Sequence, residues 1–89
     1  SKKKISLSEL REQIDSLDAE ILSLLSKRFE LVKKIGQRKK AEKKEIFDPK
    51  REKDLLKNLS QKAQIKKISS QFIEELFKLI LKQSRLLQK

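Results

Sequence analysis

The sequence predicts an all-α protein, and three observations carry this prediction. The chain of 89 residues contains one glycine and one proline, which leaves little material for tight turns. Leu, Lys, Glu, Gln and Ser dominate, and most of these residues favour a helix. Apolar residues recur at alternating steps of three and four, as they do on one face of a helix. We expect a single domain, residues 1–89, built from three helices.

The first helix is expected from about residue 7 to about residue 41. Ser6 and Glu9 form a capping box, in which a serine at the N-cap is followed three residues later by a glutamate. An apolar seam of heptad type then continues for about four heptads. Its positions are Leu7, Leu10, Ile14, Leu17, Ile21, Leu24, Arg28, Leu31 and Ile35.

Two shorter helices should follow, at about 49–63 and 70–88. Asp48 and Pro49 fit the N-cap and the first position of a helix, and either Ser69 or Ser70 caps the next one. Residues 64–68 carry no helical stripe and are interpreted as a loop. The expected apolar faces are Leu55, Leu56, Leu59 and Ala63 on the second helix, and Phe72, Ile73, Leu76, Phe77, Ile80 and Leu81 on the third.

The length of the first helix predicts a dimer. Its residues would extend about 50 Å, whereas a compact globule of this size measures about 30 Å across. Two shorter helices cannot cover the whole seam. Antiparallel pairing with the same helix of a second chain would bury the seam, so we expect a homodimer.

The residue inventory excludes several kinds of chemistry. The chain has no cysteine and no histidine, which rules out a thiolate nucleophile, a Ser-His triad and a zinc site of Cys or His. No apolar run approaches the roughly 18–20 residues that span a bilayer. Lys2, Lys3 and Lys4 are not followed by an apolar segment, so we expect no signal peptide and a cytoplasmic protein.

The formal charge of +11 indicates an anionic partner, either a nucleic acid or a small metabolite. Lysine supplies most of this charge, because 19 of the 24 basic residues are lysines. Arginine is kept at positions 11, 28, 38, 51 and 85. These five positions are candidates for a bidentate guanidinium contact that lysine cannot imitate, although chance usage would also explain them.

Arg28 occupies a seam position, where a charge is costly unless it is paired. Lys39 lies about 16 Å further along the same face, and Arg11 lies about 25 Å in the other direction. No small ligand bridges Arg11 and Arg28 within one chain, but an antiparallel partner could bring its own Arg11 to the site. Alternatively, Arg28 reaches solvent or pairs with a nearby acid.

Polar residues also lie in line with both later apolar faces. Asp48 and Glu52 stand at the start of the second stripe, beside Arg51, and Ser84 and Gln88 extend the third. They are either pocket-lining residues or ordinary helix ends, since acids in a first turn favour the helix dipole.

The combination of these residues resembles the all-helical class of chorismate mutase, as in the mutase domain of bifunctional chorismate mutase–prephenate dehydratase. The resemblance spans nearly the whole chain. Its motifs are Leu10-Arg11-x-x-Ile14-x-x-Leu17-Asp18, Leu24-Leu25-x-x-Arg28, Lys39, Asp48-Pro49-x-Arg51-Glu52 and Ser84-x-x-x-Gln88.

The resemblance implies an intertwined homodimer with two shared sites that isomerise chorismate to prephenate, in aromatic amino acid biosynthesis. Arg28 and the partner's Arg11 would bind the two carboxylates, and Lys39 and Gln88 would donate to the ether oxygen. Glu52, with the backbone near Asp48, would hold the ring hydroxyl. The remaining implied contacts come from Arg51 and Ser84.

The implied reaction is a concerted Claisen rearrangement that needs no proton transfer, metal or cofactor. Catalysis would come from restraining the substrate conformation and from donors aimed at the ether oxygen. Two other functions remain open from the sequence: an enzyme like isochorismate pyruvate lyase, and a basic helical module that binds nucleic acid or protein without catalysis.

Overall fold

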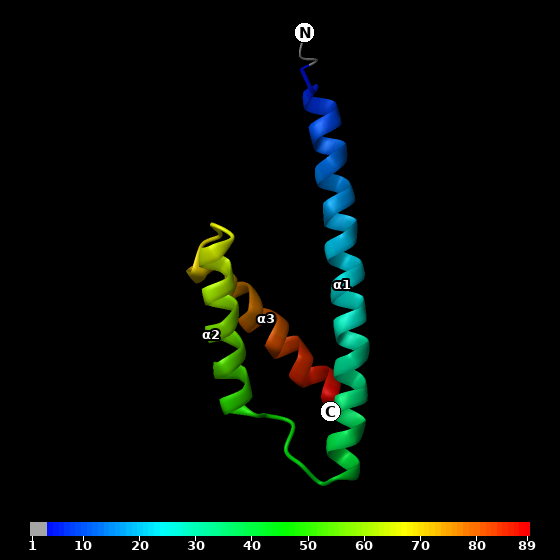
Figure 1. Cartoon of the computed structure of the whole chain (residues 1–89). Helices are drawn as coiled ribbons and strands as arrows, with labels where there is room; N and C mark the ends of the chain where they lie inside the picture. Colours follow the sequence, from blue (N-terminus) through cyan, green and yellow to red (C-terminus); the bar gives the residue numbers. More distant parts are fainter. Residues whose placement is uncertain (1–3) are drawn as a thin grey trace. The chain divides into compact units, whose positions relative to one another are not determined.

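The computed structural model describes residues 4–89 (Figure 1). It contains three helices: α1 (Leu7–Ala41), α2 (Pro49–Ile65) and α3 (Ser70–Gln88). No strand occurs within residues 4–89, so the prediction of an all-α fold with three helices is confirmed. Lys2 and Lys3, from the basic segment considered for a signal peptide, lie outside the described residues. None of the helices in the described part of the chain is long and apolar enough to cross a membrane.

The chain divides into two compact units, Ser1–Glu30 and Leu31–Lys89. The described part of the first unit is the N-terminal portion of α1 with the short segment before it. The second unit contains the rest of α1 together with α2 and α3.

In the first unit, α1 begins at its predicted cap and keeps its apolar seam exposed. Ser6 Oγ accepts a hydrogen bond of 3.1 Å from the backbone N–H of Glu9, as a capping serine should. The leucines and isoleucines of the seam in this unit are between 43% (Leu10) and 64% (Leu24) exposed. Helix propensity and capping therefore form this part of α1 without burying its apolar face.

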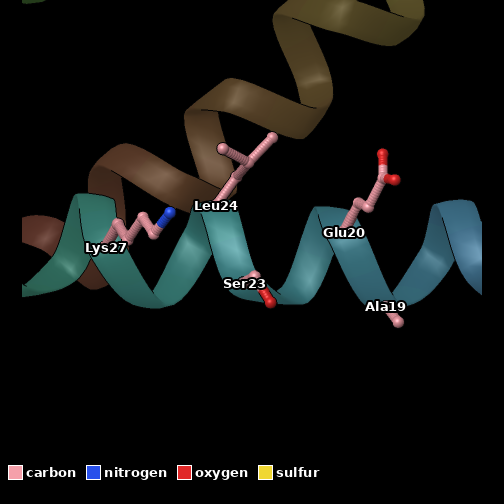
Figure 2. Close-up of a pocket in the computed structure, with 5 residues that line it drawn as sticks. All are labelled: Ala19, Glu20, Ser23, Leu24 and Lys27. Carbon is pink, nitrogen blue, oxygen red and sulfur yellow. The ribbon is translucent and has the colours of Figure 1, made fainter.

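A shallow hollow of about 370 Å³ lies along this part of α1 (Figure 2). Its lining residues are Ala19, Glu20, Ser23, Leu24 and Lys27, and all of them belong to α1. Ligand sites normally enclose most of a ligand surface, which the side of one helix cannot do. The hollow is therefore not a ligand site in its own right.

In the second unit, α2 and α3 pack as an antiparallel hairpin (Figure 1). Two polar contacts fix their relative direction. Ser60 Oγ on α2 donates to Glu74 Oε1 on α3 at 2.9 Å, and the Glu52–Arg85 ion pair joins the opposite ends of the same helices. The backbone oxygen of Ser60 also accepts from Ser70 Oγ at 3.2 Å, which ties the start of α3 to α2.

The core of this unit is small. Val32 of α1, Ala63 of α2 and Leu81 of α3 are the buried hydrophobic residues among residues 4–89. The apolar face predicted for α3 is only partly covered, because Phe72 is 55% exposed and Leu76 is 38% exposed. The predicted face is wider than the surface that α2 offers, so its outer members stay in contact with solvent.

The C-terminus of α1 closes in a Schellman motif. The backbone N–H of Lys44 donates to the oxygen of Lys39 at 2.8 Å, and that of Lys43 donates to the oxygen of Lys40 at 3.2 Å. Lys43 has a φ of 55°, in the left-handed region that usually favours glycine. The motif turns the chain sharply after α1 and directs it toward the start of α2.

The C-terminus of α2 uses the same motif and corrects one prediction. Residues 64–68 were expected to form a loop, but Gln64 and Ile65 are helical. The Schellman bonds set the true end: Ile68 N–H donates to Ala63 O, Lys67 N–H donates to Gln64 O, and Lys67 has a φ of 59°. Ile65 breaks the apolar pattern because it is 82% exposed, and a helix can continue without burying every apolar residue.

Lys67→Gly should stabilise the protein, because glycine adopts a positive φ without the steric penalty of a side chain. We expect the free energy of unfolding to rise by about 0.5–1 kcal/mol, after allowing for the greater freedom of glycine in the unfolded chain. Lys66→Gly is the matched control, since Lys66 has a φ of −86° and should lose stability. Urea titrations of both variants would test this, and equal changes in the two would contradict it.

Candidate active site

Six of the eight predicted site residues lie in the second unit: Lys39, Asp48, Arg51, Glu52, Ser84 and Gln88. All three helices contribute to this set. Arg11 and Arg28 lie in the first unit, where Arg11 is exposed and Arg28 is half-buried. Seventeen residues of α1 separate these two arginines, which corresponds to about 25 Å along the helix, so one chain does not bring them together.

Lys39 lies near the end of α1 and is half-buried. Its Nζ donates a hydrogen bond of 2.8 Å to the backbone oxygen of Ile46, in the segment between α1 and α2. An ammonium group carries three protons, so this single contact leaves two available to other acceptors. The contact also fixes the direction of the side chain.

Asp48 caps α2, as predicted. Its Oδ1 accepts a hydrogen bond of 3.1 Å from the backbone N–H of Arg51, and its backbone oxygen accepts one of 3.1 Å from the N–H of Glu52. With Pro49 at the start of the helix, the local sequence fixes where α2 begins. This cap places Arg51 in the first turn, where it is exposed, and Glu52 beside it, half-buried.

Glu52 is paired with a residue to which the sequence assigned no role. A single nitrogen of Arg85, Nη1, lies 2.6 Å from Oε1 and 2.8 Å from Oε2 of Glu52. The guanidinium of Arg85 also lies 5.2 Å from the centre of the Phe47 ring. Arg85 was among the five arginine positions considered for a bidentate contact, but nothing in the sequence identified its partner.

Ser84 and Gln88 lie one turn apart near the C-terminus of α3. Ser84 is 4% exposed, and its Oγ donates to the backbone oxygen of Ile80 at 2.7 Å. Gln88 Nε2 donates to the backbone oxygen of Ser84 at 3.3 Å. Gln88 Oε1 is buried and accepts no hydrogen bond from any residue in 4–89. A buried acceptor without a donor is costly, so this amide is suited to a polar partner.

Gly36 of α1 sets how closely α3 approaches. A Cβ atom at this position would lie 2.7 Å from both the Cα and the backbone oxygen of Gln88. Real Cβ atoms essentially never come so close to backbone atoms, so only glycine permits this packing. The one glycine of the chain therefore positions Gln88.

Two hollows flank these last turns of α3. One, of about 420 Å³, is lined by Ile46, Phe47, Lys82, Arg85, Leu86 and Lys89. The other, of about 240 Å³, is lined by Lys33, Gln37, Lys40, Leu87, Gln88 and Lys89. Cationic side chains line both, which gives the surface around Gln88 a positive potential and favours an anionic ligand.

No acidic residue is among the residues that line the two hollows. Glu42, just after α1, accepts from Lys44 Nζ at 3.1 Å and from Arg38 Nε at 3.3 Å. Hydrogen bonds from Lys44 and then Arg38 lower the pKa of the Glu42 carboxyl below its usual value. Within residues 4–89, no group of three or more His, Cys, Asp or Glu side chains is arranged to hold a metal ion.

The described chain is thus all-α, and its second unit carries several cations around the buried amide of Gln88. Comparison with known families assigns the chain to one of them. Residues 10–89 match the family described as chorismate mutase type II. The chain belongs to this family, as the resemblance in the sequence indicated.

Known relatives agree with this assignment. The T-protein of Haemophilus influenzae is 36% identical over 78 residues, which cover 88% of this chain and 21% of that protein. The bifunctional chorismate mutase/prephenate dehydratase of Escherichia coli K12 is 37% identical over 82 residues, with 92% and 21% covered. The corresponding enzyme of Buchnera aphidicola from Acyrthosiphon pisum is 37% identical over 84 residues, with 94% and 22% covered. The chain thus spans about a fifth of the length of these relatives.

Gly36→Ala should displace the end of α3, because the added methyl group meets the backbone of Gln88. We expect the free energy of unfolding to fall by about 1–3 kcal/mol, the usual cost of overpacking, even though alanine is the better helix former. Lys34→Ala, at an exposed position of the same helix, is the control and should change stability little. Thermal and urea unfolding would measure both. A Gly36→Ala protein as stable as the parent would contradict the close packing.

Proposed function

We propose that this chain is a cytoplasmic chorismate mutase that works as an intertwined homodimer and isomerises chorismate to prephenate. The observation that carries the proposal is the family match over residues 10–89. The structure supports it by gathering Lys39, Glu52, Ser84 and Gln88 in one unit, on all three helices.

The donors of the site suit an ether oxygen that gains negative charge. In the proposed reaction the ether C–O bond breaks as a C–C bond forms, and negative charge grows on that oxygen in the transition state. Lys39 keeps two protons free of Ile46, and Gln88 Nε2 keeps one hydrogen free of Ser84. Fixed donors of this kind stabilise the transition state more than the ground state, since they are already oriented before reaction.

The remaining roles concern substrate binding. Arg28 and the partner subunit's Arg11 would each pair with one substrate carboxylate, because guanidinium and carboxylate form strong charge-assisted bonds. Glu52 would accept the hydrogen bond of the ring hydroxyl, beside the backbone of Asp48, with Arg51 and Ser84 completing the pocket. Holding the substrate in its reactive conformation removes much of the entropic barrier without any proton transfer.

Homodimer formation is part of the proposal, with a second copy of this chain on the seam of α1. The seam repeats at heptad spacing over the first unit and its leucines and isoleucines are exposed, so two copies can cover each other in antiparallel register. Each chain alone buries few apolar side chains within residues 4–89, which leaves folding dependent on association.

The direct test is an assay with purified protein. Chorismate should be consumed, as followed by loss of its absorbance, and prephenate should be identified as the product. Isochorismate should not be cleaved to pyruvate. No turnover of chorismate by a folded protein would refute the proposal. Cleavage of isochorismate alone would assign the pyruvate lyase reaction instead.

Arg28→Lys should fail although the charge is kept, because one ammonium cannot replace the guanidinium fork at a half-buried position. We expect kcat/KM to fall about 30- to 1000-fold, equivalent to about 2–4 kcal/mol of transition-state stabilisation. Arg38→Lys is the matched control, since the Arg38 side chain is 80% exposed on the same helix and should tolerate the change. A loss below about threefold in Arg28→Lys would mean that Arg28 does not bind substrate.

Mixed variants should reveal a site shared between subunits. Arg11→Ala and Arg28→Ala chains should each be nearly inactive alone, in particles of about twice 10.5 kDa by light scattering. After mixing and refolding, random pairing gives half heterodimers, each with one intact site, so about a quarter of the parent activity should return. If heterodimers form but activity stays absent, both arginines belong to the site of one chain.

A further inference from the structure

The ion pair between Glu52 and Arg85 differs from the other ion pairs described for this chain. It joins α2 to α3 across 33 positions of sequence, with both carboxylate oxygens within 2.8 Å of Arg85 Nη1. Its side chains are 20% and 33% exposed, whereas Glu42 and Arg38 are 41% and 80% exposed. Exposed pairs contribute little because solvent screens them and their side chains are mobile. The Glu52–Arg85 pair is shielded enough to hold its geometry.

Phe47 supports Arg85 from a second direction. The guanidinium lies 5.2 Å from the ring centre of Phe47, a distance typical of a cation–π contact. Phe47 immediately precedes Asp48, the cap of α2, so the backbone that carries the ring lies next to the start of the helix that carries Glu52. Arg85 is thereby restrained by an aromatic ring and by a carboxylate, and its position does not depend on a bound ligand.

This arrangement matters for a substrate that carries two carboxylates. Glu52 would accept a hydrogen bond from the substrate hydroxyl, yet its own negative charge repels such a dianion. Arg85 offsets that charge at a distance of one hydrogen bond. A carboxylate has about four lone-pair sites, so two contacts with Arg85 leave acceptor positions for the hydroxyl.

We propose that Arg85, backed by Phe47, is a positioning residue that holds the Glu52 carboxylate in its acceptor orientation and compensates its charge when the substrate binds. This inference rests on the proposed chorismate mutase activity. Arg85 touches no reacting atom in this scheme. Its effect passes through Glu52, so removing Glu52's charge should remove the need for Arg85.

A double-mutant cycle tests this dependence. Kinetic constants for chorismate are measured for the parent chain, Arg85→Met, Glu52→Gln and the double variant, with folding checked by circular dichroism and urea unfolding. Arg85→Met should raise KM about tenfold and lower kcat less than about threefold, because the loss falls on binding of a dianion. In the Glu52→Gln background the same change should alter kcat/KM by no more than about twofold.

Two further variants guard the result. Arg85→Lys keeps the charge and one donor, so its KM should lie between those of the parent and Arg85→Met; it also covers the case in which Arg85→Met does not fold. Arg38→Met removes the exposed arginine of the Glu42 pair and should leave KM unchanged.

The outcomes separate the two proposals. Equal losses from Arg85→Met in both backgrounds would make Arg85 a structural residue and overturn the inference. The inference would also be overturned if Arg85→Met, made in an otherwise unchanged and active chain, altered kcat/KM by less than about twofold. A folded parent chain that does not convert chorismate would overturn the proposed function and this inference with it.

Discussion

The scarcity of buried apolar surface is the constraint on which the rest of this chain depends. Burial of apolar groups is the main force that stabilises a fold, yet within residues 4–89 the buried hydrophobic residues are only Val32, Ala63 and Leu81. The longest helix leaves the leucines and isoleucines of its heptad seam exposed. A second copy with the same seam is the simplest complement, because one surface then covers an identical one. In the proposed homodimer, dimer formation and folding would be a single event, and the proposed sharing of sites between chains would depend on that pairing.

In the second unit, polar contacts fix the arrangement of α2 and α3, a role that a large apolar core has in many other proteins. Ser60 contacts Glu74 and Ser70 at one end of the α2–α3 hairpin, and the Glu52–Arg85 pair closes the other end. Net hydrogen-bond energies are modest, but each such contact specifies direction and register. The predicted site residues at the start of α2 and the end of α3 lie at the Glu52 end, so the contacts that fix the hairpin also fix these groups.

The sequence predicted the features that depend on local rules. Helix starts at Ser6, Asp48 and Ser69 follow from capping chemistry, which acts within a few residues. The predicted end of α2 was wrong for two reasons. Lys67 adopts a positive φ, which a lysine in the sequence does not indicate. Ile65 is apolar but exposed, so it did not fit the apolar stripe expected of a helix.

The partner of Arg85 could not be predicted for a different reason. Residues 52 and 85 meet only because α2 and α3 pack in one particular register, and that register is set by many weak contacts together. The close approach of α3 at Gly36 could not be predicted from the sequence either. A glycine inside a helix can mean a locally less stable helix or a close contact with another element, and the sequence does not distinguish the two. Residue types could therefore nominate candidates for the site, whereas their pairing required the structure.

Lys39 and Arg85 differ in the number of acceptors that each cation meets. Lys39 contacts one backbone oxygen, for which a compact ammonium with rotatable donors is sufficient. Arg85 meets two carboxylate oxygens through one nitrogen, and its planar guanidinium also lies over an aromatic ring. The abundant lysines contribute to the charge of +11 and so attract an anion over a distance, without specifying its orientation. The general attraction of an anion and the fixed orientation of the Glu52 carboxylate thus come from different residues of the chain.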